Sequence, residues 1–87
     1  MSVDGAWAPR VTLLTKPGCH LCDDARPVLV EVLTPLGLEF DEVDITTDDA
    51  LYAAHWTDIP VVLVDGEVVA IHRVGADVLR AALPGGN

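Results

Sequence analysis

The chain has 87 residues, 51% of them hydrophobic, and this predicts one globular domain because a single core usually occupies about 50–200 residues. Its formal net charge of −9 at pH 7 argues against nucleic acid as a partner, since binding to phosphates needs a basic surface. The longest apolar run, residues 59–64, is too short to cross a membrane, so we expect no membrane partner. Residues 1–18 lack the cationic start and apolar block of a signal peptide, and we therefore expect a cytoplasmic protein.

The predicted domain spans residues 10–83, between a disordered leader at 1–9 and a tail at 84–87. Residues 10–15 read Arg-Val-Thr-Leu-Leu-Thr, a β-branched and apolar run that is typical of a buried strand. The Pro-Gly pair at 17–18 is expected to end this strand and to lead into the next element.

A helix is predicted from Cys19 onward, where apolar residues recur at spacings of three and four. Pro27 lies inside it and should kink it, and Gly37 suits a left-handed position after it. Residues 38–45 then alternate between apolar and acidic side chains, which predicts a second strand.

The second half of the chain predicts another helix, a hairpin and a closing helix. Residues 46–55 begin with two threonines and two aspartates, which indicates a short helix with a threonine cap. The apolar run at 59–64 predicts a strand, and the Asp-Gly pair at 65–66 predicts a type I′ turn into a partner strand at 67–72. A helix at 75–83 would complete the domain.

These elements follow the order β-α-β-α-β-β-α, which indicates the α/β class. The first two strands are joined through a helix, so they should be parallel with a right-handed crossover. The last two form a hairpin and are therefore antiparallel. We predict a mixed four-stranded sheet flanked by helices on both faces.

Cys19 and Cys22 lie at the start of the first helix, three positions apart. This spacing places them on one helix face with Cβ atoms about 5–6 Å apart, so they can form a disulfide with little backbone movement. The loop that such a disulfide closes is too short to stabilise the fold appreciably. The spacing therefore favours redox chemistry over a structural crosslink.

The predicted helix terminus distinguishes the two thiols. At the cap, free N–H groups and the helix dipole favour a thiolate at Cys19, and Lys16 or a protonated His20 would add positive charge. The two aspartates that follow Cys22 oppose ionisation, so we expect a moderately lowered pKa for Cys19. Cys19 would attack a substrate disulfide, and Cys22 would then resolve the mixed disulfide.

Other interpretations of the cysteine pair remain open. Zinc would need two more ligands, and His55 and His72 are scattered along the chain, so we expect no metal bound by these residues alone. Covalent haem attachment needs a histidine after the second cysteine, where this chain has Asp23. The pair could instead serve a non-catalytic redox sensor or adaptor, or a metal or cluster carrier that shares its cysteines across a dimer.

Two segments resemble the thioredoxin superfamily, and more narrowly a small bacterial glutaredoxin-like protein. They are residues 16–22 (Lys-Pro-Gly-Cys-His-Leu-Cys) after an apolar strand, and the distant residues 59–62 (Ile-Pro-Val-Val). The resemblance covers residues 10–83 and implies a thioredoxin/glutaredoxin-like fold. It also implies a cis peptide bond before Pro60, with Pro60 facing the cysteines and the Ile59 backbone pairing with an extended substrate segment.

Several positions depart from glutaredoxins and bear on the substrate. Leu21 replaces their usual aromatic residue, and Asp58 replaces a threonine, which places a carboxylate where it would repel glutathione. Lys16 could either bind a glutathione carboxylate or tune Cys19. Gly75 lies in a segment similar to the closing hairpin of thioredoxins, where it would let a partner approach closely or simply precede the last helix.

The sequence thus predicts a monomeric thiol–disulfide oxidoreductase that acts on protein or small-molecule disulfides. No bound cofactor is expected, because electrons would come from glutathione or from a thioredoxin-reductase-type system. The predicted site consists of two catalytic residues, four substrate-binding residues and one tuning residue, in that order: Cys19, Cys22, Ile59, Pro60, Lys16, Gly75 and His20.

Overall fold

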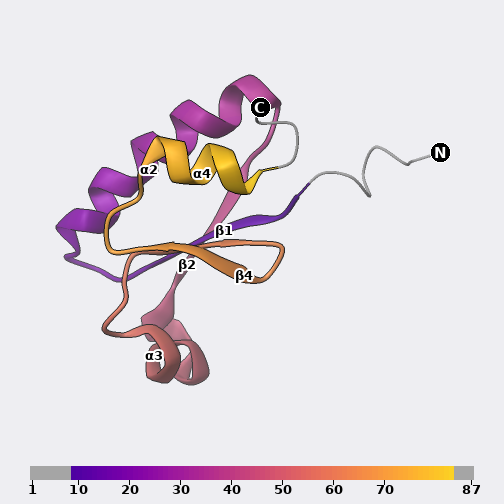
Figure 1. Ribbon diagram of the computed structural model, residues 1–87. Helices are drawn as coiled ribbons and strands as arrows, with labels where there is room; N and C mark the ends of the chain where they lie inside the picture. The colour runs from indigo at the N-terminus through magenta and orange to yellow at the C-terminus, as the bar shows by residue number, and fades with distance from the viewer. Residues whose placement is uncertain (1–8, 84–87) are drawn as a thin grey trace.

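The computed structural model describes residues 9–83 (Figure 1). The tail predicted at 84–87 and the leader predicted at 1–9, apart from Pro9, lie outside the described residues. Within the described range the chain forms strands, α-helices and short 3₁₀ helices in this order: β1 (Val11–Thr15), α2 (His20–Leu33), η1 (Thr34–Leu36), β2 (Phe40–Asp44), η2 (Ile45–Thr47), α3 (Asp49–His55), β3 (Val61–Val64), β4 (Glu67–Ile71) and α4 (Ala76–Ala82).

The strands of this range form one mixed sheet in the order β2-β1-β3-β4. β1 pairs with β2 in parallel, with α2 as the crossover, and with β3 in an antiparallel arrangement. β3 and β4 form the predicted antiparallel hairpin. Its turn residues Asp65 and Gly66 have φ of 52° and 86°, and positive φ at both positions defines the predicted type I′ turn.

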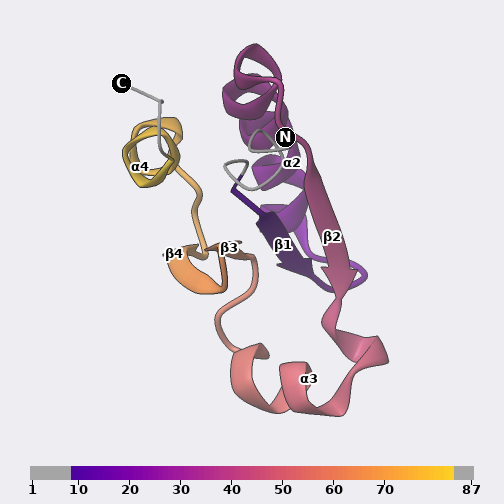
Figure 2. The same ribbon diagram turned by 90° about the vertical axis from the view of Figure 1, so that its right-hand side faces the viewer.

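The helices lie on both sides of the sheet, as predicted. α2 and α4 lie together on one side, and α3 lies on the other, beyond the ends of the strands (Figures 1 and 2). The larger core, which we call the helix-side core, fills the space between the sheet and the α2–α4 pair; it consists of Val11, Leu13, Ala25, Leu29, Val32, Leu33, Val62, Val64, Leu79 and Leu83.

A second and smaller core lies at the start of α2, and we call it the site-side core. Its buried members come from four different segments: Leu14, Cys22, Ile45, Ile59 and Val61. α3 has no buried residue of its own and contributes only the partly buried Leu51 to this core. The site-side core therefore joins the first turn of α2 to the segment that precedes β3.

The predicted helix cap at the threonines is wrong. The N-cap of α3 is Asp48, whose carboxylate accepts the Leu51 N–H at 3.0 Å. The two threonines instead belong to η2, because the Asp44 carboxylate accepts both the N–H and the hydroxyl of Thr46, at 2.8 and 2.6 Å. Two aspartates thus divide the segment into a 3₁₀ turn and a short helix.

Other boundaries differ from the prediction by one or two residues. β2 begins at Phe40, and β3 begins at Val61, after the proline that cannot donate to a ladder. α2 continues through Pro27 as one helix to Leu33. Gly37 has the predicted left-handed φ of 71°, although it ends η1 rather than α2 itself. No helix among the described residues is long and apolar enough to cross a membrane.

Candidate functional site

The first cysteine is the N-cap of α2, as predicted. Cys19 has φ −92° and ψ 110°, the extended conformation of a cap, and its Sγ accepts the Cys22 N–H at 3.2 Å. The carbonyl oxygen of Cys19 accepts the Asp23 N–H at 3.3 Å. The sulfur thus takes the place that a serine or aspartate oxygen usually occupies at a cap.

The two thiols differ in access to solvent, and burial affects the ionisation of Cys22. Both are free, but Cys19 is half-buried whereas Cys22 is fully buried in the site-side core. Burial raises the pKa of the Cys22 thiol from 9.0 to about 12, and the hydrogen bond and charge of Cys19 act in the same direction. A hydrogen bond from the Lys16 backbone and the positive charge of Arg26 oppose this rise in the pKa of Cys22.

The segment with the cis-proline contributes to the same core as the cysteine pair. The Ile59–Pro60 peptide bond is cis. Ile59 belongs to the same buried core as Cys22, and Cys19 packs against that core. The carbonyl oxygen of Pro60 accepts the His72 N–H at 2.9 Å, which ties this turn to the segment that follows β4.

The remaining predicted residues surround this pair at different distances from it. Lys16 follows β1 and is half-buried, and its backbone contacts the Cys22 sulfur. His20 is the exposed first residue of α2. Gly75 is the N-cap of α4 and has an ordinary φ of −90°, so its backbone conformation alone does not require glycine.

A pocket of about 160 Å³ lies between α2 and the segment that precedes α4, and neither cysteine lines it. Gly75 does not line this pocket, but it directly follows Val74, which does. Apolar and charged side chains both contribute to its wall: Leu21, Asp24, Ala25, Val28, His72, Arg73 and Val74. A larger hollow of about 290 Å³ near the other end of α2 contains none of the predicted site residues.

His72 and Trp56 are both exposed side chains of segments connected to the cis-proline turn. His72 is exposed but adopts a positive φ of 63°, and its Nε2 lies 2.9 Å from the Thr57 carbonyl oxygen. Trp56 is 54% exposed in the loop that leads to the cis-proline. Among residues 9–83, no three histidine, cysteine, aspartate or glutamate side chains gather as a possible metal site.

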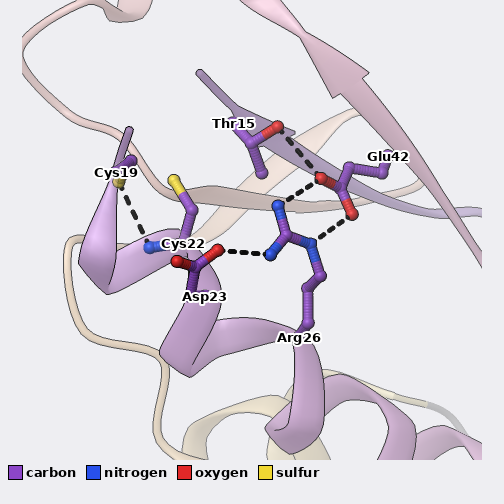
Figure 3. Close-up of polar contacts among 6 residues, drawn as sticks. All are labelled: Thr15, Cys19, Cys22, Asp23, Arg26 and Glu42. Atoms are coloured by element: carbon purple, nitrogen blue, oxygen red, sulfur yellow. Dashed lines mark hydrogen bonds and ion pairs between the residues drawn. The ribbon is translucent and has the colours of Figure 1, made fainter. Parts of the chain in front are cut away.

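An ion-pair network beside the cysteines was not foreseen from the sequence (Figure 3). The Arg26 guanidinium donates through Nε and Nη2 to the two carboxylate oxygens of Glu42, both at 2.7 Å, and through Nη1 to Asp23 Oδ1 at 2.6 Å. The hydroxyl of Thr15 donates to Glu42 Oε2 at 3.2 Å. The hydrogen bonds from Arg26 hold the pKa of the Glu42 carboxyl below its usual range, and the two carboxylates raise the pKa of Arg26.

The sequence indicates the contact of this network that lies within α2, but it does not indicate the contact with β2. Arg26 follows Asp23 by three positions and Cys22 by four, so all three share one helix face. Glu42 is sixteen residues away and reaches the network only because β2 pairs with β1 in a register that sets Glu42 opposite Leu13.

Comparison with known proteins identifies the family of the chain. The family described as "Glutaredoxin-like domain (DUF836)" matches residues 10–84. The chain is 34% identical over 83 residues to the uncharacterized protein Rv0508 of Mycobacterium tuberculosis, with 84% of this chain and 86% of that protein covered.

Two solved structures share the fold. Protein Ne2328 from Nitrosomonas europaea superposes with a TM-score of 0.78 at 19% identity, over 88% of this chain and 93% of that one. Fasciola hepatica thioredoxin superposes with a TM-score of 0.62 at 20% identity, over 88% of this chain and 79% of that one. The predicted thioredoxin/glutaredoxin-like fold is therefore confirmed.

Proposed function

The chain belongs to the glutaredoxin-like domain family, and from this membership and the cysteine geometry we propose that it is a dithiol thiol–disulfide oxidoreductase. The observation that carries the proposal is the asymmetry of the pair. Cys19 is half-buried at a helix N-terminus and accepts a backbone N–H, whereas Cys22 is fully buried one turn further on. One thiol is thus suited to attack, and the other is protected from any partner except its neighbour.

The reaction takes two exchange steps. The Cys19 thiolate attacks one sulfur of the substrate disulfide, so that a Cys19–substrate bond forms and the other substrate sulfur leaves as a thiolate. Cys22 then gives up its proton to water and attacks Cys19 Sγ. The Cys19–substrate bond breaks, the second substrate sulfur leaves, and the Cys19–Cys22 disulfide holds the two oxidising equivalents.

The cis-proline turn and the adjacent pocket support a role in substrate binding. We propose that the Ile59 backbone pairs with an extended substrate segment beside Pro60, and that one flank of the substrate lies near Gly75, where no side chain intervenes. Lys16 and His20 would stabilise negative charge near Cys19. The net charge of −9 favours protein substrates with a basic docking face.

We propose that the protein works as a monomer in the cytoplasm and holds no bound cofactor. An external dithiol or glutathione system must reduce the Cys19–Cys22 disulfide after each turnover. Asp58 stands where its carboxylate would repel glutathione. We therefore expect a reductase-type system to reduce the protein faster than glutathione does at the same redox potential.

An equilibrium redox titration against a thiol buffer tests the proposal, with thiol alkylation and Trp56 fluorescence as readouts. A two-electron couple in the range of glutaredoxins and thioredoxins, about −200 to −270 mV, is expected. With a recycling system, Cys19→Ser should abolish disulfide reduction, and Cys22→Ser should accumulate a mixed disulfide. A protein that forms the disulfide reversibly but does not turn over a model disulfide would be a sensor or adaptor instead.

A further inference from the structure

The polar network of Arg26, Asp23, Glu42 and Thr15 lies directly beside the buried thiol. Arg26 follows Cys22 by four positions on α2, and positions with this spacing lie one above the other on one helix face. Figure 3 shows the Cys22 sulfur and the Arg26 guanidinium on the same side of the helix, both directed toward β1 and β2. Arg26 is the only arginine or lysine of α2, and its guanidinium lies on the side of the helix that carries the Cys22 sulfur.

The guanidinium is held in place from two elements. Glu42 of β2 accepts two of its hydrogen bonds at 2.7 Å, and Asp23 of α2 accepts a third at 2.6 Å. Thr15, which is 4% exposed at the end of β1, fixes the Glu42 carboxylate in turn. Planar pairing through two nitrogens restricts an arginine far more than a single contact does, so the charge keeps one position.

In the resolution step the buried Cys22 must ionise, and a positive charge nearby favours its thiolate. In the mixed disulfide Cys19 no longer carries a negative charge, so two of the influences that raise the pKa of Cys22 are gone while burial remains. Arg26 is the charged side chain whose field lowers that pKa, beside the hydrogen bond from the Lys16 backbone. A buried thiol without such a charge would ionise too rarely to attack quickly.

We propose that Arg26 is a positioning residue for the resolution step, because its guanidinium, clamped by Glu42 and Asp23, holds a positive charge beside Cys22 and stabilises the thiolate that attacks Cys19. This inference rests on the proposed oxidoreductase function and adds to it a residue outside the cysteine and proline motifs. It assigns Glu42 and Thr15 the task of holding Arg26 rather than of contacting substrate.

The two steps can be observed separately with one equivalent of dithiobis(nitrobenzoate). Attack by Cys19 releases one nitrothiobenzoate in a phase whose rate depends on concentration. Attack by Cys22 on Cys19 releases the second nitrothiobenzoate in a phase that does not depend on concentration. In Cys22→Ser only the first release is expected, which assigns the second phase to the resolving thiol.

Arg26→Gln should slow the second phase and leave the first within about twofold. A rise of one in the pKa of Cys22 lowers its thiolate fraction about tenfold, and the greater nucleophilicity of the more basic thiolate returns about threefold, so a net slowing of about threefold or more is expected. Arg80→Gln is the matched control, because Arg80 pairs with Glu31 and Asp77 away from the cysteines and carries the same charge. It should leave both phases unchanged.

Two further variants separate charge from structure. Arg26→Lys keeps the charge but not the pairing through two nitrogens and should recover part of the second-phase rate, whereas Glu42→Gln weakens the clamp and should slow that phase by less than Arg26→Gln does. If Arg26→Lys were as slow as Arg26→Gln, or if Glu42→Gln left the second phase unchanged, the inference would be wrong. Failure of the wild type to release a second nitrothiobenzoate would instead overturn the oxidoreductase proposal itself.

Discussion

The buried thiol makes the stability of the reduced protein fall in mild alkali. In the unfolded chain the pKa of Cys22 is near its ordinary value of 9.0, whereas burial raises it to about 12 in the fold. Above pH 9 the unfolded state therefore loses a proton that the folded state retains, and stability decreases with rising pH. Each pH unit between these two values costs about 1.4 kcal/mol, so from pH 8 to pH 10 we expect a loss of about 1.4 kcal/mol from this thiol.

Urea unfolding at pH 8 and at pH 10 measures this loss, with a phosphine reductant present to keep both thiols reduced. The informative quantity is the difference between the wild type and Cys22→Ala, because contributions that the two proteins share cancel in it. The variant lacks the buried thiol and should lose about 1.4 kcal/mol less over this interval. Equal losses in the two proteins would refute the assignment of a strongly raised pKa to Cys22.

Three further predictions concern the fold around the site. Leu79 is the only buried residue of α4, so Leu79→Ala should cost about 3–5 kcal/mol in urea unfolding, whereas the neighbouring Val78→Ala, at a half-exposed position, should cost less than about 0.5 kcal/mol. Gly66→Ala should lower stability by about 1 kcal/mol, because the φ of Gly66 is 86°. Gly75→Ala should be tolerated, because the φ of Gly75 is −90° and a Cβ there would meet Val78 Cγ2 only at 4.0 Å. Thermal unfolding of the two variants measures the contrast. The pKa of Glu42 is lowered, so its ion pair with Arg26 stabilises the fold above the ordinary carboxyl pKa, and this stabilisation is lost as the pH falls. Both side chains are about one-third exposed, so Glu42→Gln should cost at most about 1 kcal/mol at pH 7. At pH 2 it should cost nothing, and urea unfolding at the two pH values measures the difference.

Features that depend on a few adjacent residues could be predicted from the sequence. The Pro-Gly turn before Cys19 and the helical periodicity after it predict the helix cap that the structure has at this residue. The type I′ turn follows from the Asp-Gly pair between two apolar runs. The prediction of a threonine cap is wrong for a local reason as well, because the carboxylates of Asp44 and Asp48 accept the free N–H groups of that segment.

Contacts between distant segments could not be predicted in this way. Glu42 is one of the acidic residues that alternate with apolar ones at 38–45, and nothing near it in sequence indicates a partner. Its contact with Arg26 requires the parallel register of β2 on β1 and the crossover of α2 above them. The cis-proline turn lies beside the cysteines for the same long-range reason, and it was foreseen only through the resemblance to a known family.

In the proposed mechanism the helix cap at Cys19 has a consequence for Cys22. A helix that begins at Cys19 must carry Cys22 one turn inward, and here that turn packs against Leu14, Ile45 and Val61. Burial protects Cys22 from unrelated oxidants, but it also holds the thiol in its protonated form. A cation fixed on the next turn of the same helix meets both conditions, because it favours the thiolate without opening the core to solvent. Such a charge would need two carboxylates to keep it in place, and Glu42 and Asp23 occupy those two positions.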